Sequence, residues 1–111
     1  MERVRVNRGE IYLCDLGVPV GHEQGHKRPV LIASQGEMAR AGIPIVIPIS
    51  KTKKGYPTHI ELEGVLSTTS YLQCEQIRVA SVKRLLHKIG EVDGLVMLQV
   101  EMMLKRMLGL H

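Results

Sequence analysis

Short segments in which apolar residues dominate, or alternate with polar ones, recur along the first half of this chain. Residues 8–16 ("RGEIYLCDL") alternate, which is typical of a half-buried β-strand. Residues 28–34 ("RPVLIAS") are apolar at successive positions, which predicts a strand buried on both faces. Residues 43–50 ("IPIVIPIS") also predict a strand, and the two prolines favour a place partly at a sheet edge or a bulge.

The second half of the chain continues with short extended segments. Residues 59–64 ("HIELEG") alternate clearly, and residues 69–80 ("TSYLQCEQIRVA") supply one or two further strands. Residues 87–92 are expected to be extended as well. Ser81 is a candidate cap for a short helix over residues 82–86.

A helix is predicted over residues 94–108. Asp93 is a good N-cap for it, and Gly109 can end it. The apolar residues of this segment cover more surface than one helical stripe. Either the rest of the domain nearly engulfs the helix, or its second face packs against another chain.

These elements predict a mostly β (α+β) fold. Five to seven short strands followed by one helix favour a small, curled antiparallel β-barrel with a C-terminal α-helix. The 111 residues suit one domain over residues 1–111, and the sequence contains no internal repeat or linker.

Composition narrows the class of partner. The formal net charge is +4 and the isoelectric point is about 9.3, which favours an anionic partner. The chain has no Phe, no Trp and three Tyr, which disfavours binding of single strands by base stacking. Three groups of basic residues could share one phosphate-facing surface: Arg3, Arg5 and Arg8; Lys51, Lys53 and Lys54; and Arg78, Lys83, Arg84 and Lys88.

The cysteines and the hydropathy profile bear on the compartment. Cys14 and Cys74 lie in apolar, strand-like segments and are expected to be small buried thiols in a reducing environment. We see no signal peptide and no apolar run long enough to span a bilayer. We therefore expect a soluble, cytoplasmic protein that does not bind membranes.

Arg28 is the first candidate for chemistry, because it joins a polar loop to the rigid strand that begins at Pro29. A guanidinium is permanently charged, and its fork matches two phosphate oxygens. A polar surface loop with Arg28 paired to a carboxylate is the alternative that spacing leaves open. The preceding loop offers possible acids, bases and donors: His22, Glu23, Gln24, His26 and Lys27.

Other polar positions carry weaker signals. Ser50 ends the third predicted strand, where a hydroxyl could face the same groove as Arg28 or could simply cap a turn. His59 at a strand start could be a packing histidine. The pair Glu75–Gln76 lies in a predicted strand and must find hydrogen-bond partners there. His22 and His26 are four residues apart, a spacing that suits metal binding from a helix, but Gly21 and Gly25 disfavour a helix there. No tetrahedral ligand set is evident, so we expect no metal and no other cofactor.

Four blocks of the sequence occur in the order and spacing of a known family. "RGEIYLCDL", "GHEQGHKRPVLIAS", "KGYPTHIEL" and "CEQIRVASVKRL" resemble the MazF/PemK toxins of bacterial toxin–antitoxin pairs over about residues 7–90. The resemblance implies an SH3-like barrel that works as a homodimer and cleaves single-stranded RNA at short specific sequences without a metal ion. It further implies attack by a 2′-hydroxyl on the adjacent phosphate, leaving 2′,3′-cyclic phosphate and 5′-hydroxyl ends. A cognate antitoxin would lay an extended acidic segment along the RNA groove.

The resemblance also carries site roles to individual residues. The essential arginine of the family falls on Arg28, the acidic loop residue on Glu23, and the hydroxyl residue after the third strand on Ser50, where several relatives have threonine. These three are the expected catalytic residues. The residues expected to bind RNA are His22, Gln24, His26, Lys27, Lys51, Lys53, Lys54, His59, Gln76 and Arg78.

Two other functions compete with RNA cleavage. Sibling toxins of the same fold poison DNA gyrase through a C-terminal segment with an exposed tryptophan, which this chain lacks. A barrel that binds RNA without cutting it would fit the charge equally well, but the poverty in aromatic residues disfavours it.

Overall fold

The computed structural model describes residues 5–22 and 25–111. The elements follow one another as β1 (Glu10–Asp15), β2 (Lys27–Ile32), α1 (Gly36–Arg40), β3 (Ile45–Ser50), β4 (His59–Leu62), β5 (Ser70–Gln73), β6 (Arg78–Val79), β7 (Leu85–Glu91) and α2 (Gly94–Leu108). Two 3-10 turns, Cys74–Gln76 and Val82–Arg84, flank β6. No helix within the described ranges is long and apolar enough to span a membrane.

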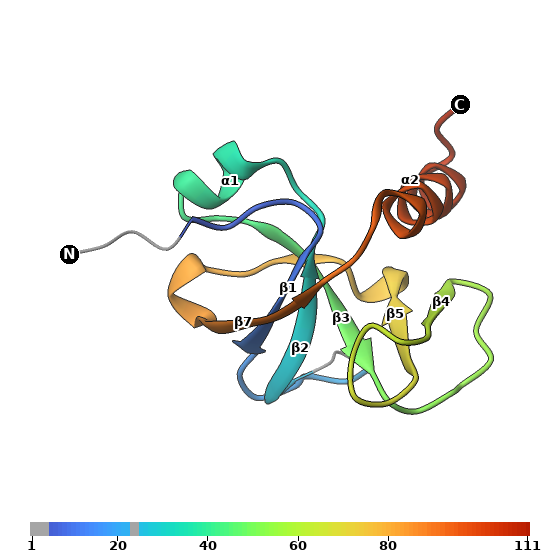
Figure 1. Ribbon diagram of the computed structural model, residues 1–111, viewed down its shortest axis with the longest axis horizontal. Helices are drawn as coiled ribbons and strands as arrows, with labels where there is room; N and C mark the ends of the chain where they lie inside the picture. The colour runs from blue at the N-terminus through green and yellow to red at the C-terminus, as the bar shows by residue number, and fades with distance from the viewer. Residues whose placement is uncertain (1–4, 23–24) are drawn as a thin grey trace.

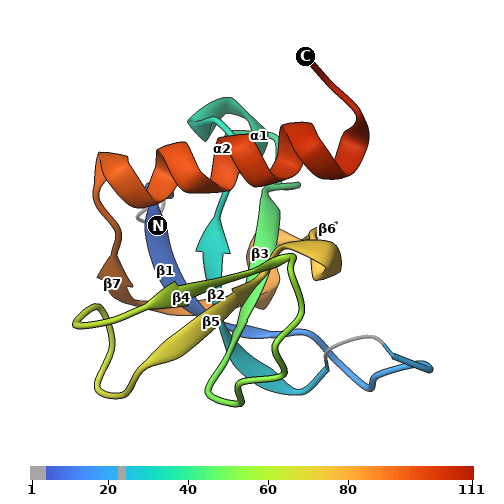
Figure 2. The ribbon, with the colours of Figure 1, turned by 90° about the vertical axis from the view of Figure 1, so that its right-hand side faces the viewer.

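The strands form a curled, antiparallel sheet with the order β4-β5-β3-β2-β1-β7, and the short β6 pairs with β3. The predicted mostly β fold with a C-terminal helix is therefore confirmed. The outer strands β4 and β7 do not pair with each other in this order, so the barrel remains open. The helix α2 lies across one end of the curled sheet (Figures 1 and 2). The connections β1–β2, β3–β4 and β4–β5 gather at the other end (Figure 2).

The central strands are buried on both faces, as the apolar run in β2 predicted. Val30, Leu31 and Ile32 are all fully buried. Val30 and Ile32 belong to one core cluster, and Leu31 belongs to a second cluster that also includes Met97 and Val100 of α2. The sheet therefore separates two apolar cores, and α2 covers one of them.

The prediction that β3 lies partly at a sheet edge is wrong. β3 lies between β2 and β5, and it changes partner along its length from β6 to β5. The backbone N and O of Ile45 both bond towards β2, so the nitrogen of Pro48 points to the opposite side. On that side β6 pairs with residues 45–46 and β5 with residues 49–50. The missing N–H of Pro48 therefore falls in the gap between two partner strands, where it removes no ladder hydrogen bond.

The predicted caps of the C-terminal helix are confirmed, whereas the short helix predicted after Ser81 is not formed as an α-helix. Asp93 Oδ1 accepts a hydrogen bond from the Val96 backbone N at 3.0 Å, and Gly109 adopts a left-handed φ of 68° at the C-cap. The Ser81 side chain caps only a 3-10 turn, because β7 begins directly after it. Glu75 lies in a 3-10 turn rather than in the predicted strand.

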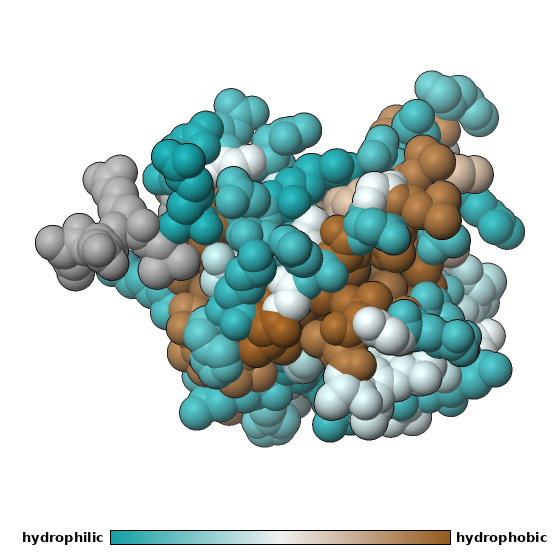
Figure 3. All heavy atoms as spheres, in the orientation of Figure 1, coloured by the Kyte–Doolittle hydropathy of each residue, from teal (hydrophilic) through white to brown (hydrophobic). Residues whose placement is uncertain are grey.

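One face of α2 is apolar and exposed, so the domain does not engulf the helix. Leu95, Leu98 and Met102 are 67%, 51% and 63% exposed. Apolar residues continue from α2 across the face of the molecule in Figure 3, and Leu86 and Ile89 of β7 are exposed as well. A second chain could cover this exposed apolar surface of α2.

Candidate functional site

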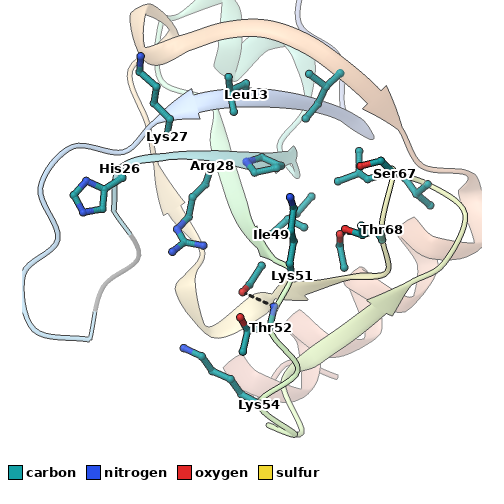
Figure 4. Close-up of a pocket in the computed structure, with 16 residues that line it drawn as sticks. Leu13, His26, Lys27, Arg28, Ile49, Lys51, Thr52, Lys54, Ser67 and Thr68 are labelled. Atoms are coloured by element: carbon teal, nitrogen blue, oxygen red, sulfur yellow. Dashed lines mark hydrogen bonds between the residues drawn. The ribbon is translucent and has the colours of Figure 1, made fainter.

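A pocket of about 880 Å³ opens at the end of the sheet away from α2 (Figure 4). We call it the cationic pocket. Its wall combines residues from β1, the end of the β1–β2 loop, β2, β3, β5, β7 and the loops after β3 and β4. The lining residues are Leu13, His26, Lys27, Arg28, Pro29, Ile49, Ser50, Lys51, Thr52, Lys54, Val65, Leu66, Ser67, Thr68, Ser70 and Ile89.

Arg28 is held at this wall by β2 and by a bond to the preceding loop. It pairs in register with Cys14 of β1 and is half-buried. Its Nε donates a hydrogen bond to the Gly25 carbonyl at 3.1 Å. That bond fixes the side chain on the Nε side. Within the described residues the two terminal nitrogens make no hydrogen bond, so they are available to a ligand. Figure 4 shows Arg28 of β2 and Lys51 of the β3–β4 loop extending into the same part of the pocket, with Thr52 below them.

Ser50 is the last residue of β3, and it is buried to 6% exposure. Its Oγ accepts a hydrogen bond from the Thr52 backbone N at 3.1 Å. Because Oγ is the acceptor in this bond, the hydroxyl retains its own proton for donation. A strand-end serine can thus act both as a turn residue and as a donor towards the pocket.

The described part of the pocket wall carries charge of one sign. It includes Lys27, Arg28, Lys51 and Lys54, and no described Asp or Glu lines it. Cations that converge on a concave surface with an apolar floor create a strong local positive potential. The predicted acidic residue Glu23 and its neighbour Gln24 lie outside the described residues.

His26 is held at the pocket rim in a left-handed conformation, with φ of 62°. Its backbone N donates to the Gly17 carbonyl at 2.6 Å, and its carbonyl accepts from Leu16 N at 2.8 Å. A side chain at Gly25 would collide with Pro19, since an added Cβ would come within 2.4 Å of its ring. The base of the β1–β2 loop is therefore tightly packed, and it presents His26 next to Arg28.

Several residues predicted to bind RNA lie outside the pocket. Lys53 is exposed on the β3–β4 loop but does not line it. Gln76 Nε2 donates to the His22 carbonyl at 3.2 Å, which links the 3-10 turn after β5 to the β1–β2 loop. Arg78 Nε donates to the Val79 carbonyl at 3.4 Å.

Burial raises the pKa of the Cys14 thiol, and the charge of the nearby Arg78 opposes that rise.

His59 also lies outside the cationic pocket, in a network with Thr58 and Glu75. Its Nε2 is 3.0 Å from Glu75 Oε2, and Thr58 Oγ1 donates to Glu75 Oε1 at 2.7 Å. The His59 side chain is 4% exposed, and the Tyr56 ring packs against it at a centroid distance of 5.1 Å. Burial raises the pKa of the Glu75 carboxyl, but hydrogen bonds from Thr58 and His59 outweigh this and lower it. The network ties the start of β4 to the 3-10 turn.

The described residues contain no group of three His, Cys, Asp or Glu side chains that could hold a metal ion. Cys14 and Cys74 are buried and unpaired with each other, as the sequence predicted. Burial raises the pKa of the Cys74 thiol to about 12, so it is neither a thiolate ligand nor a nucleophile at neutral pH.

Sequence reasoning did not anticipate two parts of the wall. Thr52 follows Ser50, and residues 65–70 bring two apolar side chains and three hydroxyls from the β4–β5 loop. The run "STTS" at residues 67–70 is a visible cluster of hydroxyl residues. Nothing in it indicates which strands the loop would lie beside.

A curled antiparallel sheet with this pocket defines a small β-protein with a cationic pocket at one end, and comparison with known proteins names its family. Residues 7–108 match the family model described as the PemK-like, MazF-like toxin of type II toxin-antitoxin systems. Endoribonuclease MazF of Staphylococcus epidermidis is 36% identical over 113 residues, which span 96% of this chain and 93% of that protein. The chain belongs to the PemK-like, MazF-like toxin family.

Solved structures share the fold. MazF of Deinococcus radiodurans superposes with a TM-score of 0.87 at 23% identity, covering 97% of this chain and 100% of that one. A complex of MazE and MazF from the same organism gives a TM-score of 0.83 at 23% identity, covering 98% and 100%. A mycobacterial endoribonuclease in complex with its cognate antitoxin gives 0.77 at 24% identity, covering 96% of each chain.

Proposed function

We propose that this chain is a toxin that cleaves single-stranded RNA at specific sequences without a metal ion. The observation that carries the proposal is that Arg28 and Ser50 both line the wall of one pocket whose described charges are all positive. A phosphodiester is the ligand that this combination suits, because it is anionic and gains charge when it is attacked. The naming of the Staphylococcus epidermidis relative as an endoribonuclease supports the same reaction.

The reaction is a transesterification. The ribose 2′-oxygen forms a bond to the adjacent phosphorus, the bond from phosphorus to the 5′-oxygen breaks, and a 2′,3′-cyclic phosphate and a 5′-hydroxyl result. Donors aimed at the charge that develops on the phosphoryl oxygens lower the barrier by about 2.7–4 kcal/mol each. The terminal nitrogens of Arg28 and the hydroxyl of Ser50 are the donors in this proposal.

Protons must leave the 2′-hydroxyl and reach the departing 5′-oxygen. His26, Glu23 and His22 of the β1–β2 loop are the candidates for these two roles, each worth roughly 10²–10⁴-fold in rate. His26 lies at the rim of the pocket beside Arg28, which favours it for one of them. Lys27, Lys51 and Lys54 would hold the flanking phosphates.

The proposed assembly is a homodimer neutralised by a cognate antitoxin. The exposed apolar face of α2, with Leu95, Leu98 and Met102, offers a surface for a second copy. The mycobacterial endoribonuclease is solved with its cognate antitoxin, and MazF of Deinococcus radiodurans with MazE. An extended acidic segment of such an antitoxin would suit the cationic pocket by charge.

The test uses purified protein and a long single-stranded RNA of mixed sequence, in EDTA, beside the variant Arg28→Ala. The expected result is a set of discrete cuts with 5′-hydroxyl ends that the variant does not make. Cleavage only after Mg²⁺ is restored would contradict the metal-free mechanism. Intact RNA in both conditions would contradict nuclease activity, and an assay of gyrase supercoiling and one of RNA binding would then decide between the other two functions.

A further inference from the structure

The cationic pocket has two chemically different walls. The wall formed by β2 and the β3–β4 loop carries the four cations described above. The opposite wall, residues 65–70 of the β4–β5 loop and β5, carries no charge and offers Val65, Leu66, Ser67, Thr68 and Ser70. In Figure 4, Ser67 and Thr68 face the side from which Lys51 and Arg28 approach.

Single-stranded RNA presents two kinds of chemistry to such a pocket. Its phosphates require cations, whereas its base edges require neutral donors and acceptors. A hydroxyl of Ser or Thr can both donate to a base and accept from it. If the phosphate lies against Arg28, the uncharged wall is left for the base and sugar of a neighbouring nucleotide.

The uncharged wall is held in place by the protein. Val65 and Leu66 pack against the core cluster beneath α2. The Leu66 side chain and the Val65 carbonyl lie against β7 at Gly90, where an added Cβ would be 3.5 Å and 3.8 Å away from them. The buried Ser70 donates from Oγ to the Thr68 carbonyl at 3.0 Å, which fixes the backbone between them.

Two hydroxyls remain for a ligand. Within the described residues, neither Ser67 Oγ nor Thr68 Oγ1 makes a hydrogen bond to the protein, and both residues are exposed at the pocket. Within the described lining, His26 is the only aromatic ring, and it belongs to the cationic side, so the uncharged wall offers no ring on which a base could stack. Hydrogen bonding by a fixed loop is the means of base selection that this wall provides.

We propose that Ser67 and Thr68 are specificity-determining residues, which read the base edge of a nucleotide that flanks the scissile phosphate. The inference rests on the proposed endoribonuclease function and adds to it a source of sequence preference on the β4–β5 loop. Ser67 and Thr68 contact the base in this scheme, and Ser70 positions Thr68.

The test compares cleavage-site preferences rather than total activity. Wild type, Ser67→Ala, Thr68→Val and the double variant are incubated with one pool of RNA of mixed sequence, and all cut sites are mapped. Loss of one hydroxyl should reduce the preference for the favoured base at a single position by about two- to tenfold, the range for one net hydrogen bond. Thr68→Ser keeps the hydroxyl and should keep most of the preference.

Thr69→Val is the matched control, since Thr69 is an exposed neighbour that does not line the pocket. It should cut the same sites as wild type, and urea midpoints should show that all variants are folded. If the double variant cuts the same sites with the same relative rates as wild type, the inference is wrong while the nuclease stands. If wild type makes no cuts, the proposed function is wrong and the inference falls with it.

Discussion

The cationic pocket can be compared with a second hollow, which lies between β4 and α2. The two hollows contain similar residue types, but they differ in whether an acidic residue balances the cations. The second hollow, which we call the helix groove, has a volume of about 510 Å³ and is lined by His59, Ile60, Glu61, Gln99, Met102, Met103 and Arg106. Each hollow holds one arginine and one histidine. In the helix groove, Arg106 shares the wall with an acidic residue, Glu61, whereas the described wall of the cationic pocket has no acidic residue to balance Arg28.

The histidines of the two hollows differ in burial and in the partners of their side chains. His59 is nearly fully buried and is bonded to Glu75. His26 is exposed at the rim of the cationic pocket, and its hydrogen bonds to Gly17 and Leu16 are made by its backbone. Buried polar groups that are bonded to one another stabilise a fold, while exposed groups whose charges are left unbalanced are available to a ligand. Residue type alone therefore does not separate a binding site from a structural network in this chain, but pairing and burial do.

The largest expected effect is a difference in RNA cleavage rate between variants of the two arginines, Arg28 and Arg106. Arg28→Ala should lower the rate of RNA cleavage by roughly 10²–10³-fold, the usual loss when one donor to a developing anion is removed. Arg106→Ala removes an equivalent side chain from the helix groove and should leave the cleavage rate nearly unchanged. Single-turnover rates on one RNA oligonucleotide measure both. A similar loss in both variants would contradict the assignment of catalysis to the cationic pocket.

The histidine comparison should separate stability from activity. His59→Ala removes a buried side chain and a partner of Glu75, so it should lower the free energy of unfolding by about 2–3 kcal/mol. Cleavage per folded molecule should change little.

His26→Asn is the matched variant, because Asn tolerates the left-handed backbone at this position. It should leave stability nearly intact and slow cleavage. Urea unfolding and single-turnover cleavage give the two quantities, and a stability loss from His26→Asn alone would reverse the interpretation.

Local sequence patterns predicted most of the elements of this fold. Alternation identified β1 and β4, a continuous apolar run identified β2, and Asp93 and Gly109 marked the two ends of α2. Each of these signals acts over a few residues and depends on a backbone geometry that those residues adopt by themselves. The position of β3 inside the sheet was not predicted. A proline indicates only that one backbone N–H is missing from the strand, and it does not identify the strands that pair with it.

The candidate site was predictable only where the chain joins a loop to a strand. Arg28 beside Pro29, and Ser50 at the end of an apolar run, could be selected from the sequence, and both line the pocket. Glu75 could not be placed, since its 3-10 turn is maintained by bonds to Thr58. Ser67, Thr68 and Ser70 line the pocket because of how the curled sheet pairs β5 with β3 and β4, and that register involves residues far apart in the sequence.

A smaller effect should come from the pH dependence of stability. The pKa of Glu75 is lowered in the folded protein from the ordinary value of 4.5, so its ionised form stabilises the fold fully above that value. This stabilisation is lost as the pH falls through the folded pKa. Glu75→Gln should therefore lose less stability than wild type as the pH falls through the range below about 4.5. Urea midpoints across that range measure it, and parallel curves for the two proteins would show that the Glu75 bonds contribute nothing to the fold.

The smallest expected effect distinguishes two adjacent lysines. Lys54 lines the cationic pocket and Lys53 does not, although both are exposed on the same loop. Binding of an RNA oligonucleotide with a 2′-deoxy sugar at the cleavage position, which lacks the attacking hydroxyl, can be measured at several salt concentrations. Lys54→Ala should reduce the slope of log Kd against log salt by about 0.7, the value for one phosphate contact with a single strand. Lys53→Ala should leave the slope unchanged. Equal reductions in both variants would mean that the whole β3–β4 loop, rather than the pocket wall, follows the RNA backbone.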